Sequence, residues 1–241
     1  MKTGIIVQAR TGSTRLPNKV ILPFYKDRCI LDIILQRLKT LSYPLVVATS
    51  NHTNDNQIIE ISKRNNIQAF KGSEENVLER FINCAKENSF SNIIRVCADN
   101  PFIETSLIEE LVDKNVDYSA HFFQEKPSIQ THWGVFTEFV SRAALEKIQS
   151  LTKEKTYLEH VTNYIYQNPE FFTISKMKPP VLFQANDIRL TVDNADDFKL
   201  AQELYELCIE KNFNFNLSTI LEKISQEMRL QMVKSIAFNQ K

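Results

Sequence analysis

The fold is decided by residues 4–19, GIIVQARTGSTRLPNK. This stretch opens with a short apolar run, Gly4 to Ala9, that predicts a β-strand. It then passes into a loop rich in Arg, Gly and Ser, and the next apolar segment, Ile30 to Leu41, has the residue spacing of a helix. A strand, a loop and a helix in this order indicate α/β organisation.

The same alternation of strand and helix patterns continues through the first half of the chain. It predicts a mostly parallel sheet with helices on both faces, in which right-handed crossovers bring the loops that follow the strands to one edge. Because ligands of such sheets bind at the carboxyl edge, the loop after the first strand and the loop after Ala98 are expected to face one crevice. The predicted strands are Leu45–Thr49, Gln68–Lys71 and Asn92–Ala98, and the predicted helices are Asp55–Asn65, Asn76–Glu87 and Thr105–Lys114, the last with Thr105 or Ser106 as its cap.

The stretch from Tyr118 to Phe136 interrupts this rhythm, because it holds several aromatic residues and Pro127 without a clean periodicity. We expect an extended loop or hairpin there, a projecting arm over residues 118–140 that either covers the site or packs on a partner subunit. Residues 1–241 are expected to form a single domain. Further along, the patterns predict the helices Phe139–Gln149, Tyr157–Gln167 and Asp196–Lys211, the strand Ile188–Val192 and a helical C-terminal tail.

Composition narrows the class of protein. Hydrophobic residues make up 43% of the 241 residues, enough for one core, and 29 Lys and Arg balance 29 Asp and Glu. A balanced charge argues against a nucleic-acid partner, since general nucleic-acid binders carry a basic excess. No apolar run is long enough to span a bilayer and the N-terminus lacks a signal-peptide layout, so we expect a cytoplasmic protein without a membrane partner. The four scattered cysteines are expected to be buried free thiols.

The loop after the first strand gathers positive charge. Arg10, Arg15 and Lys19 put three cations within ten residues, and Gly12 allows a close backbone approach to a ligand. Arg grips phosphate oxygens bidentately, and Lys acts as a mobile point charge. The pattern fits phosphate binding and, equally, an ordinary solvated basic loop; it matches neither the P-loop nor the dinucleotide fingerprint. Because an unpaired lysine is rarely buried, the Lys19 ammonium is expected to have no structural role.

Two apolar strand patterns end on a carboxylate. Asp99 follows the strand that ends at Ala98, and Asp193 follows the strand that ends at Val192. Mg²⁺ prefers one or two carboxylates together with phosphate oxygens and water, so both are candidate metal ligands, with a turn or helix-cap role as the alternative. The pair Asp196-Asp197 is expected to cap the following helix. The four histidines are far apart and follow no zinc-ligand spacing.

Together these segments resemble the cytidylyltransferases that make CMP-activated sugars, such as CMP-KDO synthetase and CMP-sialic acid synthetase, and especially the spore-coat-polysaccharide-type members. The loop from Gln8 to Lys19 is similar to that family's nucleotide loop almost residue for residue, and the resemblance runs from about residue 3 to residue 210. The other similar segments are Val46–Ser50 with Asp55, Gly72–Arg80, Asp99-Asn100-Pro101, Val192-Asp193 and Glu159–Thr162.

The resemblance implies the Rossmann-like fold of nucleotide-diphospho-sugar transferases, like that of type A glycosyltransferases, in a homodimer. It implies transfer of CMP from CTP to a sugar acid or related hydroxylated acceptor, with release of pyrophosphate, in surface-polysaccharide precursor synthesis. Mg²⁺ is the implied cofactor, held by Asp99 and Asp193. The implied catalytic residues are Lys19, Arg15, Arg10, Asp99 and Asp193; the implied nucleotide-binding residues are Gln8, Ala9, Arg10, Gly12, Ser13, Arg15, Lys19, Gly72 and Ser73; the implied acceptor-binding residues are Glu138, His132 and His160.

One departure from this family lies in the region that normally faces the acceptor. Spore-coat-type members often carry Gly-Leu-Asp-x-Glu where this chain has Gly134-Val135-Phe136-Thr137-Glu138, so Phe136 replaces an acidic residue. Trp133 and Phe136 serve either packing or substrate stacking, and His160 is either structural or an acceptor contact. Two other functions stay open: a nucleotidyltransferase that acts on a phosphorylated small-molecule acceptor, and a non-catalytic protein that binds a nucleotide or sugar.

Overall fold

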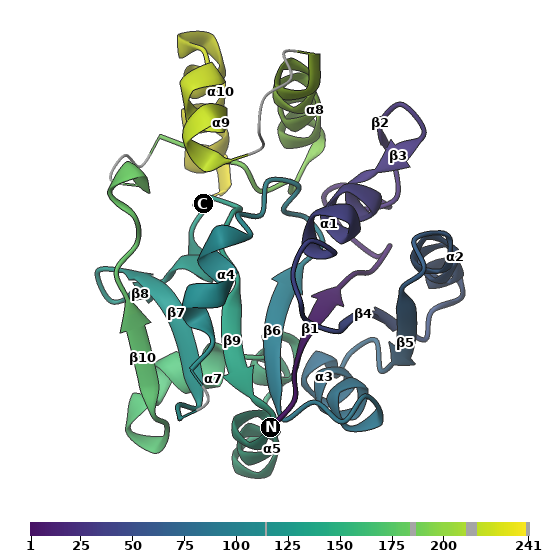
Figure 1. Ribbon diagram of the computed structural model, residues 1–241, viewed down its shortest axis with the longest axis vertical. Coiled ribbons are helices and arrows are strands. Elements are labelled where there is room, and N and C mark those ends of the chain that lie inside the picture. The colour runs from purple at the N-terminus through teal and green to yellow at the C-terminus, as the bar shows by residue number, and fades with distance from the viewer. Residues whose placement is uncertain (114, 184–186, 211–215, 240–241) are drawn as a thin grey trace.

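The centre of the fold is an eight-stranded sheet (Figure 1). The computed structural model describes residues 1–113, 115–183, 187–210 and 216–239. Its strands are β1 (Thr3–Gln8), β4 (Leu45–Ser50), β5 (Gln68–Gly72), β6 (Asn92–Cys97), β7 (Tyr118–Phe123), β8 (Lys126–Pro127), β9 (Glu138–Ser141) and β10 (Ile174–Met177). They follow the order β10-β7-β9-β6-β1-β4-β5, and β8 pairs with β7 outside this path. The pairs β1–β4, β1–β6, β4–β5 and β7–β10 are parallel, whereas β9 runs antiparallel to both neighbours. The predicted mostly parallel α/β architecture is confirmed.

Helices cover both faces of this sheet. They are α1 (Ile30–Leu38), α2 (Asn56–Arg64), α3 (Val77–Glu87), α4 (Ser106–Leu111), α5 (Arg142–Leu151), α6 (Lys155–Glu159), α7 (Asn163–Gln167), α8 (Ala195–Glu210), α9 (Leu217–Lys223) and α10 (Gln226–Asn239). Because successive strand residues point to opposite faces, Ile5 and Val7 join one core with α1, α2, α4 and α8, and Ile6 joins a second core with α3 and α5. Figure 1 shows α8 and α10 beyond the carboxyl edge of β1 and β6.

The elements predicted in the first half of the chain are confirmed to within a few residues. A two-stranded hairpin, β2 (Pro23–Tyr25) with β3 (Arg28–Cys29), was not predicted and leads directly into α1. Neither predicted residue caps α4 through its side chain; Glu104 accepts hydrogen bonds from the backbone N and the Oγ of Ser106 instead. The predicted end of this helix, Lys114, lies outside the described residues.

The stretch that was expected to form a projecting arm begins instead as β7, which lies inside the sheet between β9 and β10. Residues 118–122 alternate apolar and polar side chains, as in a half-exposed strand, but both faces of β7 are covered. Tyr118 and Ala120 are buried on one face, and the polar residues Ser119 and His121 are equally buried on the other. A short hairpin to β8 follows, and the remainder of the stretch forms a loop at the carboxyl edge.

In the second half, two predicted helices are confirmed only in part and one predicted strand is wrong. The predicted helix Phe139–Gln149 begins as the four-residue strand β9, and Ser141 Oγ then caps α5 by accepting from the Ala144 backbone N at 3.0 Å. The predicted helix Tyr157–Gln167 is divided into α6 and α7. Residues 188–192 are buried but form no strand, because their backbone bonds run singly to two different loops, from Leu190 N to His132 O and from Val192 N to Asp99 O.

The C-terminal part of the described chain is helical, as predicted, in α8, α9 and α10. The predicted end of α8, Lys211, lies outside the described residues. Short 3-10 turns occupy Thr53–Asp55, Ser128–Gln130, Pro169–Phe171 and Val181–Phe183. The four cysteines are free thiols, with Cys97 half-buried and the other three buried. Among the described residues, no helix has the length and apolar character needed to cross a membrane.

Candidate active site

The loop after β1 is tied to β4 by one buried carboxylate, Asp55. Its Oδ1 accepts from the backbone N and Oγ1 of Thr11 at 2.8 and 2.6 Å, and its Oδ2 accepts from Thr49 and Ser50. Burial alone would raise the pKa of Asp55, but the hydrogen bonds from Ser50, Thr11 and Thr49 outweigh burial and hold the pKa below its usual value. Asp55 therefore fixes the start of the basic loop at the carboxyl edge.

The far end of the same loop places Lys19 at the carboxyl edge of the sheet, beside Asp99. Asn18 takes a left-handed backbone conformation with φ 63°, which asparagine tolerates better than most residues, and its backbone N donates to Thr11 O at 2.9 Å. By contrast, Gly12 has no positive φ, and a Cβ there would make only an ordinary contact with Glu74 Oε1 at 3.8 Å. The turn therefore depends on Asn18 and on the Asp55 anchor rather than on the conformational freedom of Gly12.

Lys19 is buried, contrary to the expectation from its charge. Its ammonium contacts Asp99 Oδ2 at 3.0 Å, the Val192 carbonyl oxygen at 2.6 Å and Asp193 Oδ1 at 3.4 Å. An ammonium has three protons to donate, so these three acceptors satisfy it. The expectation of no structural role for this ammonium is therefore wrong: it joins the loop after β1, the end of β6 and the segment before α8.

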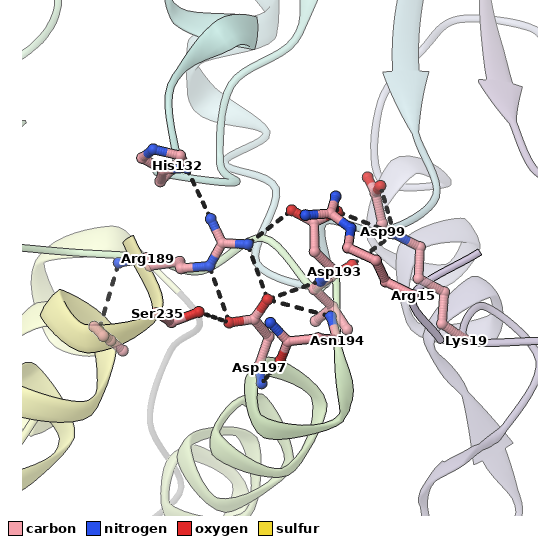
Figure 2. A network of polar contacts seen from close by, with 11 residues as sticks. Arg15, Lys19, Asp99, His132, Arg189, Asp193, Asn194, Asp197 and Ser235 are labelled. Carbon is pink, nitrogen blue, oxygen red and sulfur yellow. Dashed lines mark hydrogen bonds and ion pairs between the residues drawn. The ribbon is translucent and has the colours of Figure 1, made fainter. Parts of the chain in front are cut away.

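Asp193 is held by two arginines as well as by Lys19 (Figure 2). Its Oδ1 lies 2.8 Å from Arg15 Nη2, and its Oδ2 lies 2.7 Å from Arg189 Nη2. Arg189 is almost fully buried and also pairs through two nitrogens with Asp197, at 2.9 Å each. Burial alone would lower the pKa of Arg189, but Asp197 and Asp193 outweigh burial and raise it. The guanidinium therefore stays charged and fixes the orientation of Asp193.

Asp197 connects this cluster to the C-terminal helices. It accepts from the backbone N of Asp193 at 3.0 Å and of Asn194 at 3.3 Å, so it closes the turn that leads into α8. Ser235 of α10 donates to Asp197 Oδ1 at 2.5 Å. The backbone N of Asp197 donates to Asn194 Oδ1 at 2.9 Å, so Asn194 caps the start of α8. The Asp197 carboxylate accepts from backbone groups that precede the helix.

Two cavities meet at these carboxylates. The first, of about 310 Å³, is here called the basic cavity. Asp99 and Asp193 line it, and so do six further residues predicted from the sequence: Gln8, Arg10, Ser13, Arg15, Lys19 and His160. His160 sits in the break between α6 and α7, beside Glu159, whose Oε1 lies 3.3 Å from Arg10 Nη2.

The second cavity, of about 260 Å³, is here called the neutral cavity. It shares Cys97, Asp99 and Asp193 with the basic cavity. Its wall includes Gly134, which has φ 64° and leaves no room for a side chain, because a Cβ would lie 2.3 Å from Thr191 N. Its polar lining is formed by Asn100, Ser128, Gln130, Thr131, His132 and Thr191.

Glu138, predicted to contact an acceptor, is completely buried. Its Oε1 accepts from Arg95 Nη1 and from Thr162 Oγ1, and its Oε2 accepts from Tyr118 OH at 2.5 Å. A direct contact with an acceptor does not fit this position. The ion pair instead orients Arg95, whose Nη2 donates to Gln8 Oε1 at 3.1 Å and so fixes a side chain of the basic cavity.

Gly72 and Ser73, predicted to bind the nucleotide, lie at the end of β5 and directly after it, and they line neither cavity. A Cβ on Gly72 would lie 2.7 Å from Arg80 Cγ, so a larger residue does not fit there. Arg80 is fully buried and donates from Nη1 to the Ser73 carbonyl oxygen at 2.9 Å. Burial lowers the pKa of Arg80 to about 10. The remaining predicted nucleotide residue, Ala9, is buried under the basic loop.

Sequence reasoning missed Arg189, Asp55 and Arg95 as residues that position the site. Arg189 carried a usable signal, because it is a lone cation in an apolar run with carboxylates four and eight residues later. Asp55 carried one as well, because its partners Thr49 and Ser50 lie only six and five residues before it. Arg95 carried none, since Glu138 lies 43 residues away on another strand.

Sequence comparison identifies relatives along nearly the whole chain. The family profile described as cytidylyltransferase matches residues 4–229. An uncharacterised protein of Methanocaldococcus jannaschii is 39% identical over 241 residues, which cover 98% of this chain and 95% of that protein. The spore coat polysaccharide biosynthesis protein SpsF of Bacillus subtilis is 33% identical over 215 residues, which cover 86% of this chain and 87% of SpsF.

Solved structures show the same fold. A cytidylyltransferase from Leptospira borgpetersenii superposes with a TM-score of 0.81 at 29% identity, covering 93% of this chain and 94% of its own. CMP:2-keto-3-deoxy-manno-octonic acid synthetase, solved with CTP, superposes with a TM-score of 0.63 at 14% identity, covering 86% of this chain and 99% of its own, which is a likeness of fold. With a family match over residues 4–229 and relatives above 30% identity along most of its length, the chain belongs to the cytidylyltransferase family.

Proposed function

We propose that this chain transfers CMP from CTP to a sugar acid or related hydroxylated acceptor and releases pyrophosphate. The observation that carries the proposal is that Asp99 and Asp193 border two cavities at once, one lined by cations and the other without Arg or Lys among its described lining residues. This arrangement suits an anionic donor and a hydroxyl-bearing acceptor that meet at the shared carboxylates. Membership in the cytidylyltransferase family supports CTP as the donor.

In the proposed reaction, a hydroxyl oxygen of the acceptor attacks the α-phosphorus of CTP. A new P–O bond joins the acceptor to CMP, the bond from the α-phosphorus to the bridging oxygen breaks, pyrophosphate leaves and the hydroxyl proton is released. The protein contributes positioning and charge stabilisation. Cys97 at the boundary of the cavities is unsuited to act as a nucleophile, because burial raises the pKa of its thiol to about 11.

The basic cavity would hold the triphosphate. Arg10 and Arg15 have side chains that are 38% and 50% exposed, so both can turn toward phosphate oxygens at little cost. Lys19 lies between Asp99 and Asp193 in the structure, and its ammonium would turn to the triphosphate when Mg²⁺ takes these carboxylates. There its charge would stabilise the negative charge that develops as pyrophosphate departs. Gly72 and Ser73, held by Arg80, would contact the nucleoside beyond the cavity.

The carboxylates of Asp99 and Asp193, which border both cavities, are suitable ligands for Mg²⁺. Asp99 and Asp193 offer hard carboxylate oxygens, and Mg²⁺ commonly takes one or two carboxylates and completes its shell with phosphate oxygens and water. Among the described residues no group of three or more His, Cys, Asp or Glu side chains could hold a metal, so a site made of protein alone is not expected. We assign Asp99 and Asp193 as ligands of a Mg²⁺ that, when bound, stabilises charge on the phosphate oxygens.

His132 lines the neutral cavity, and we propose it as an acceptor contact. His160 lines the basic cavity, on the side of the triphosphate, so its predicted acceptor contact stays a prediction. The name of SpsF refers to spore coat polysaccharide biosynthesis, and we propose a comparable role for this chain in supplying surface-polysaccharide precursors. We expect a cytoplasmic homodimer, as the family resemblance implies.

A pyrophosphate-release assay with Mg²⁺ tests the function. The enzyme is offered CTP, UTP, ATP or GTP together with a panel of ulosonic acids, amino sugars and phosphorylated small molecules. CTP should be preferred, because cytosine carries a donor at its 4-position where uracil carries an acceptor, and the wrong base leaves polar groups unpaired. Comparable turnover with UTP would disprove the specificity, and tight CTP binding without pyrophosphate release on any acceptor would favour a non-catalytic nucleotide-binding protein.

A further inference from the structure

The neutral cavity has an uncharged polar lining apart from the two carboxylates at its edge. Asn100, Ser128, Gln130, Thr131 and Thr191 contribute amides and hydroxyls, and no Arg or Lys is present among its described lining residues. An anionic group seated here would find no cationic side chain in the lining, and the nearby Lys19, Arg15 and Arg189 are already paired with Asp99 and Asp193. A buried charge without a partner is costly.

His132 enters this lining as an uncharged donor. Its Nδ1 lies 2.7 Å from Arg189 Nη1, and a guanidinium only donates hydrogen bonds, so this Nδ1 must accept. The ring proton is then on Nε2. Arg189 cannot turn away, because Asp193 and Asp197 hold its other nitrogens (Figure 2). Burial and the charge of Arg189 also lower the pKa of His132, which keeps the ring neutral near pH 7.

Two atoms of the lining residues are left without partners. Asn100 and Ser128 are 6% and 2% exposed, yet Asn100 Oδ1 and Ser128 Oγ have no hydrogen-bond partner among the described residues. Buried polar atoms are nearly always satisfied, since leaving one unpaired costs about 1–3 kcal/mol. Both atoms lie just behind the surface of the cavity, so they add to the polar character of this wall but are not themselves exposed to a ligand.

The size of the cavity limits the ligand that it can hold. Its volume of about 260 Å³ lies below the range of about 300–1,000 Å³ that is usual for drug-sized ligands, so it suits a single sugar ring. Phe136 supplies an apolar wall. The same ring packs against His121 and Phe183, so the wall is fixed.

We propose that the neutral cavity binds the sugar ring of the acceptor through its hydroxyl and amide groups, and not through a carboxylate or phosphate, with His132 Nε2–H as one donor. This inference rests on the proposed function, because it names the class of acceptor for the same site. It selects a hydroxylated or N-acylated sugar over a phosphorylated acceptor. A sugar acid is accepted only if its carboxylate contributes nothing to recognition by this cavity.

Matched acceptor pairs test the inference by calorimetry on the enzyme with Mg²⁺ and the non-hydrolysable α,β-methylene analogue of CTP. One pair is N-acetylmannosamine and its 6-phosphate, and the other is N-acetylneuraminic acid and its methyl ester. The unphosphorylated sugar should bind at least about tenfold more tightly than its phosphate, and the ester should match the acid within about threefold. Tighter binding of the phosphate or of the acid by about tenfold, or no binding of any probe, would overturn the inference.

Substitutions at position 132 test the donor. His132→Gln keeps a neutral N–H donor and should keep binding of N-acetylmannosamine within about threefold, whereas His132→Phe should weaken it by on the order of tenfold. His52→Phe, at an exposed histidine that lines neither cavity, is the matched control. Nitrogen NMR of the wild type should show His132 as the neutral Nε2–H tautomer; a protonated ring or the Nδ1–H tautomer at pH 7 would refute the assignment.

Failure of this inference is distinguishable from failure of the proposed function. Binding of CTP with Mg²⁺ and release of pyrophosphate depend on the basic cavity and the carboxylates. If CTP turns over only with charged acceptors, the inference fails and the function stands. If CTP neither binds nor reacts, the function fails, while the tautomer of His132 is still decided by NMR.

Discussion

Arg189 Nη2 lies 2.7 Å from Asp193 Oδ2 and thereby fixes one of the two carboxylates that border both cavities. The same guanidinium pairs with Asp197, which accepts from Ser235 of α10. One buried cation thus connects the shared carboxylate, the start of α8 and the C-terminal helix. The orientation of Asp193 therefore depends on residues that contact neither cavity directly.

The first prediction concerns the carboxylates. Asp99→Asn and Asp193→Asn should each lower kcat by on the order of a hundredfold or more, because each removes a charged oxygen from a hard cation and preserves the side-chain shape. Asp193→Asn should also lower thermal stability, since Asp193 pairs with Arg15, Lys19 and Arg189, whereas Asp99 pairs with Lys19. Steady-state kinetics over a Mg²⁺ series check this, and near wild-type rates at saturating Mg²⁺ would remove both residues from the metal site.

The second prediction concerns Lys19, whose ammonium has both a structural and a catalytic task. Lys19→Met keeps most of the stem and removes the charge. It should lower kcat by on the order of a hundredfold, because the charge stabilises the leaving group. It should also cost about 1–3 kcal/mol of folding stability, because the oxygens of Asp99, Val192 and Asp193 lose a buried donor. Kinetics well below the melting temperature, together with denaturant unfolding, separate the two effects; unchanged stability would restore the solvated-loop interpretation.

The first half of the fold was predictable because strand and helix patterns there alternate cleanly, with β1 and β6 apolar and their carboxyl-end loops polar. The meeting of Lys19 with Asp99 follows from that topology, since the loops after β1 and β6 share one edge. The position of Asp193 did not follow, because the segment before it forms no strand. The burial of the ammonium did not follow, because a lysine is rarely buried unless its partners are known, and those partners lie 80 and 174 residues away.

The second half was poorly predictable for a different physical reason. β7 alternates apolar and polar residues over 118–122, but this run of five residues is short and passes directly into an irregular stretch that contains Pro127 and Gly134. Glu138 has the sequence context of an exposed acidic residue, yet Arg95 and Tyr118 bury it. A buried ion pair whose members lie on neighbouring strands leaves no local signal in the sequence.

The third prediction measures that ion pair. Glu138→Ala should cost about 3–5 kcal/mol of folding stability, because it leaves Arg95 as an uncompensated buried charge. Glu138→Gln should cost less, since an amide oxygen still accepts a hydrogen bond. Glu125→Ala is the matched control, because it breaks an exposed pair with Lys176 and should leave stability unchanged within error. Equal unfolding midpoints for Glu138→Ala and Glu125→Ala would show that the buried pair contributes nothing.

The fourth prediction concerns acid stability through Asp55. Its pKa in the folded chain lies below the ordinary value of 3.8, so the unfolded chain binds more protons and stability rises with pH across this range. The contribution of Asp55 is fully present above its unfolded pKa and is lost as pH falls through its folded pKa. Asp55→Asn should therefore be less stable than wild type near neutral pH, and the difference should shrink below about pH 4. A difference in melting temperature that stays constant between pH 7 and pH 3 would contradict this account.

The last prediction concerns Gly134, which holds the wall of the neutral cavity against residues 190–191. Its φ of 64° is strained for other residues, and a Cβ would lie 2.3 Å from Thr191 N and 2.5 Å from the Leu190 carbonyl carbon, both backbone atoms that cannot rotate away. Gly134→Ala should therefore cost about 2–5 kcal/mol of folding stability, the sum of backbone strain and overpacking. Gly12→Ala is the matched control for stability, because a Cβ there meets nothing closer than Glu74 Oε1 at 3.8 Å and the residue has no positive φ. Since the displaced segment leads to Asp193 through Thr191, acceptor KM in Gly134→Ala should rise more than the dissociation constant for CTP. If calorimetry finds CTP binding weakened as much as acceptor KM is raised, Gly134 supports the whole carboxyl edge rather than the neutral cavity.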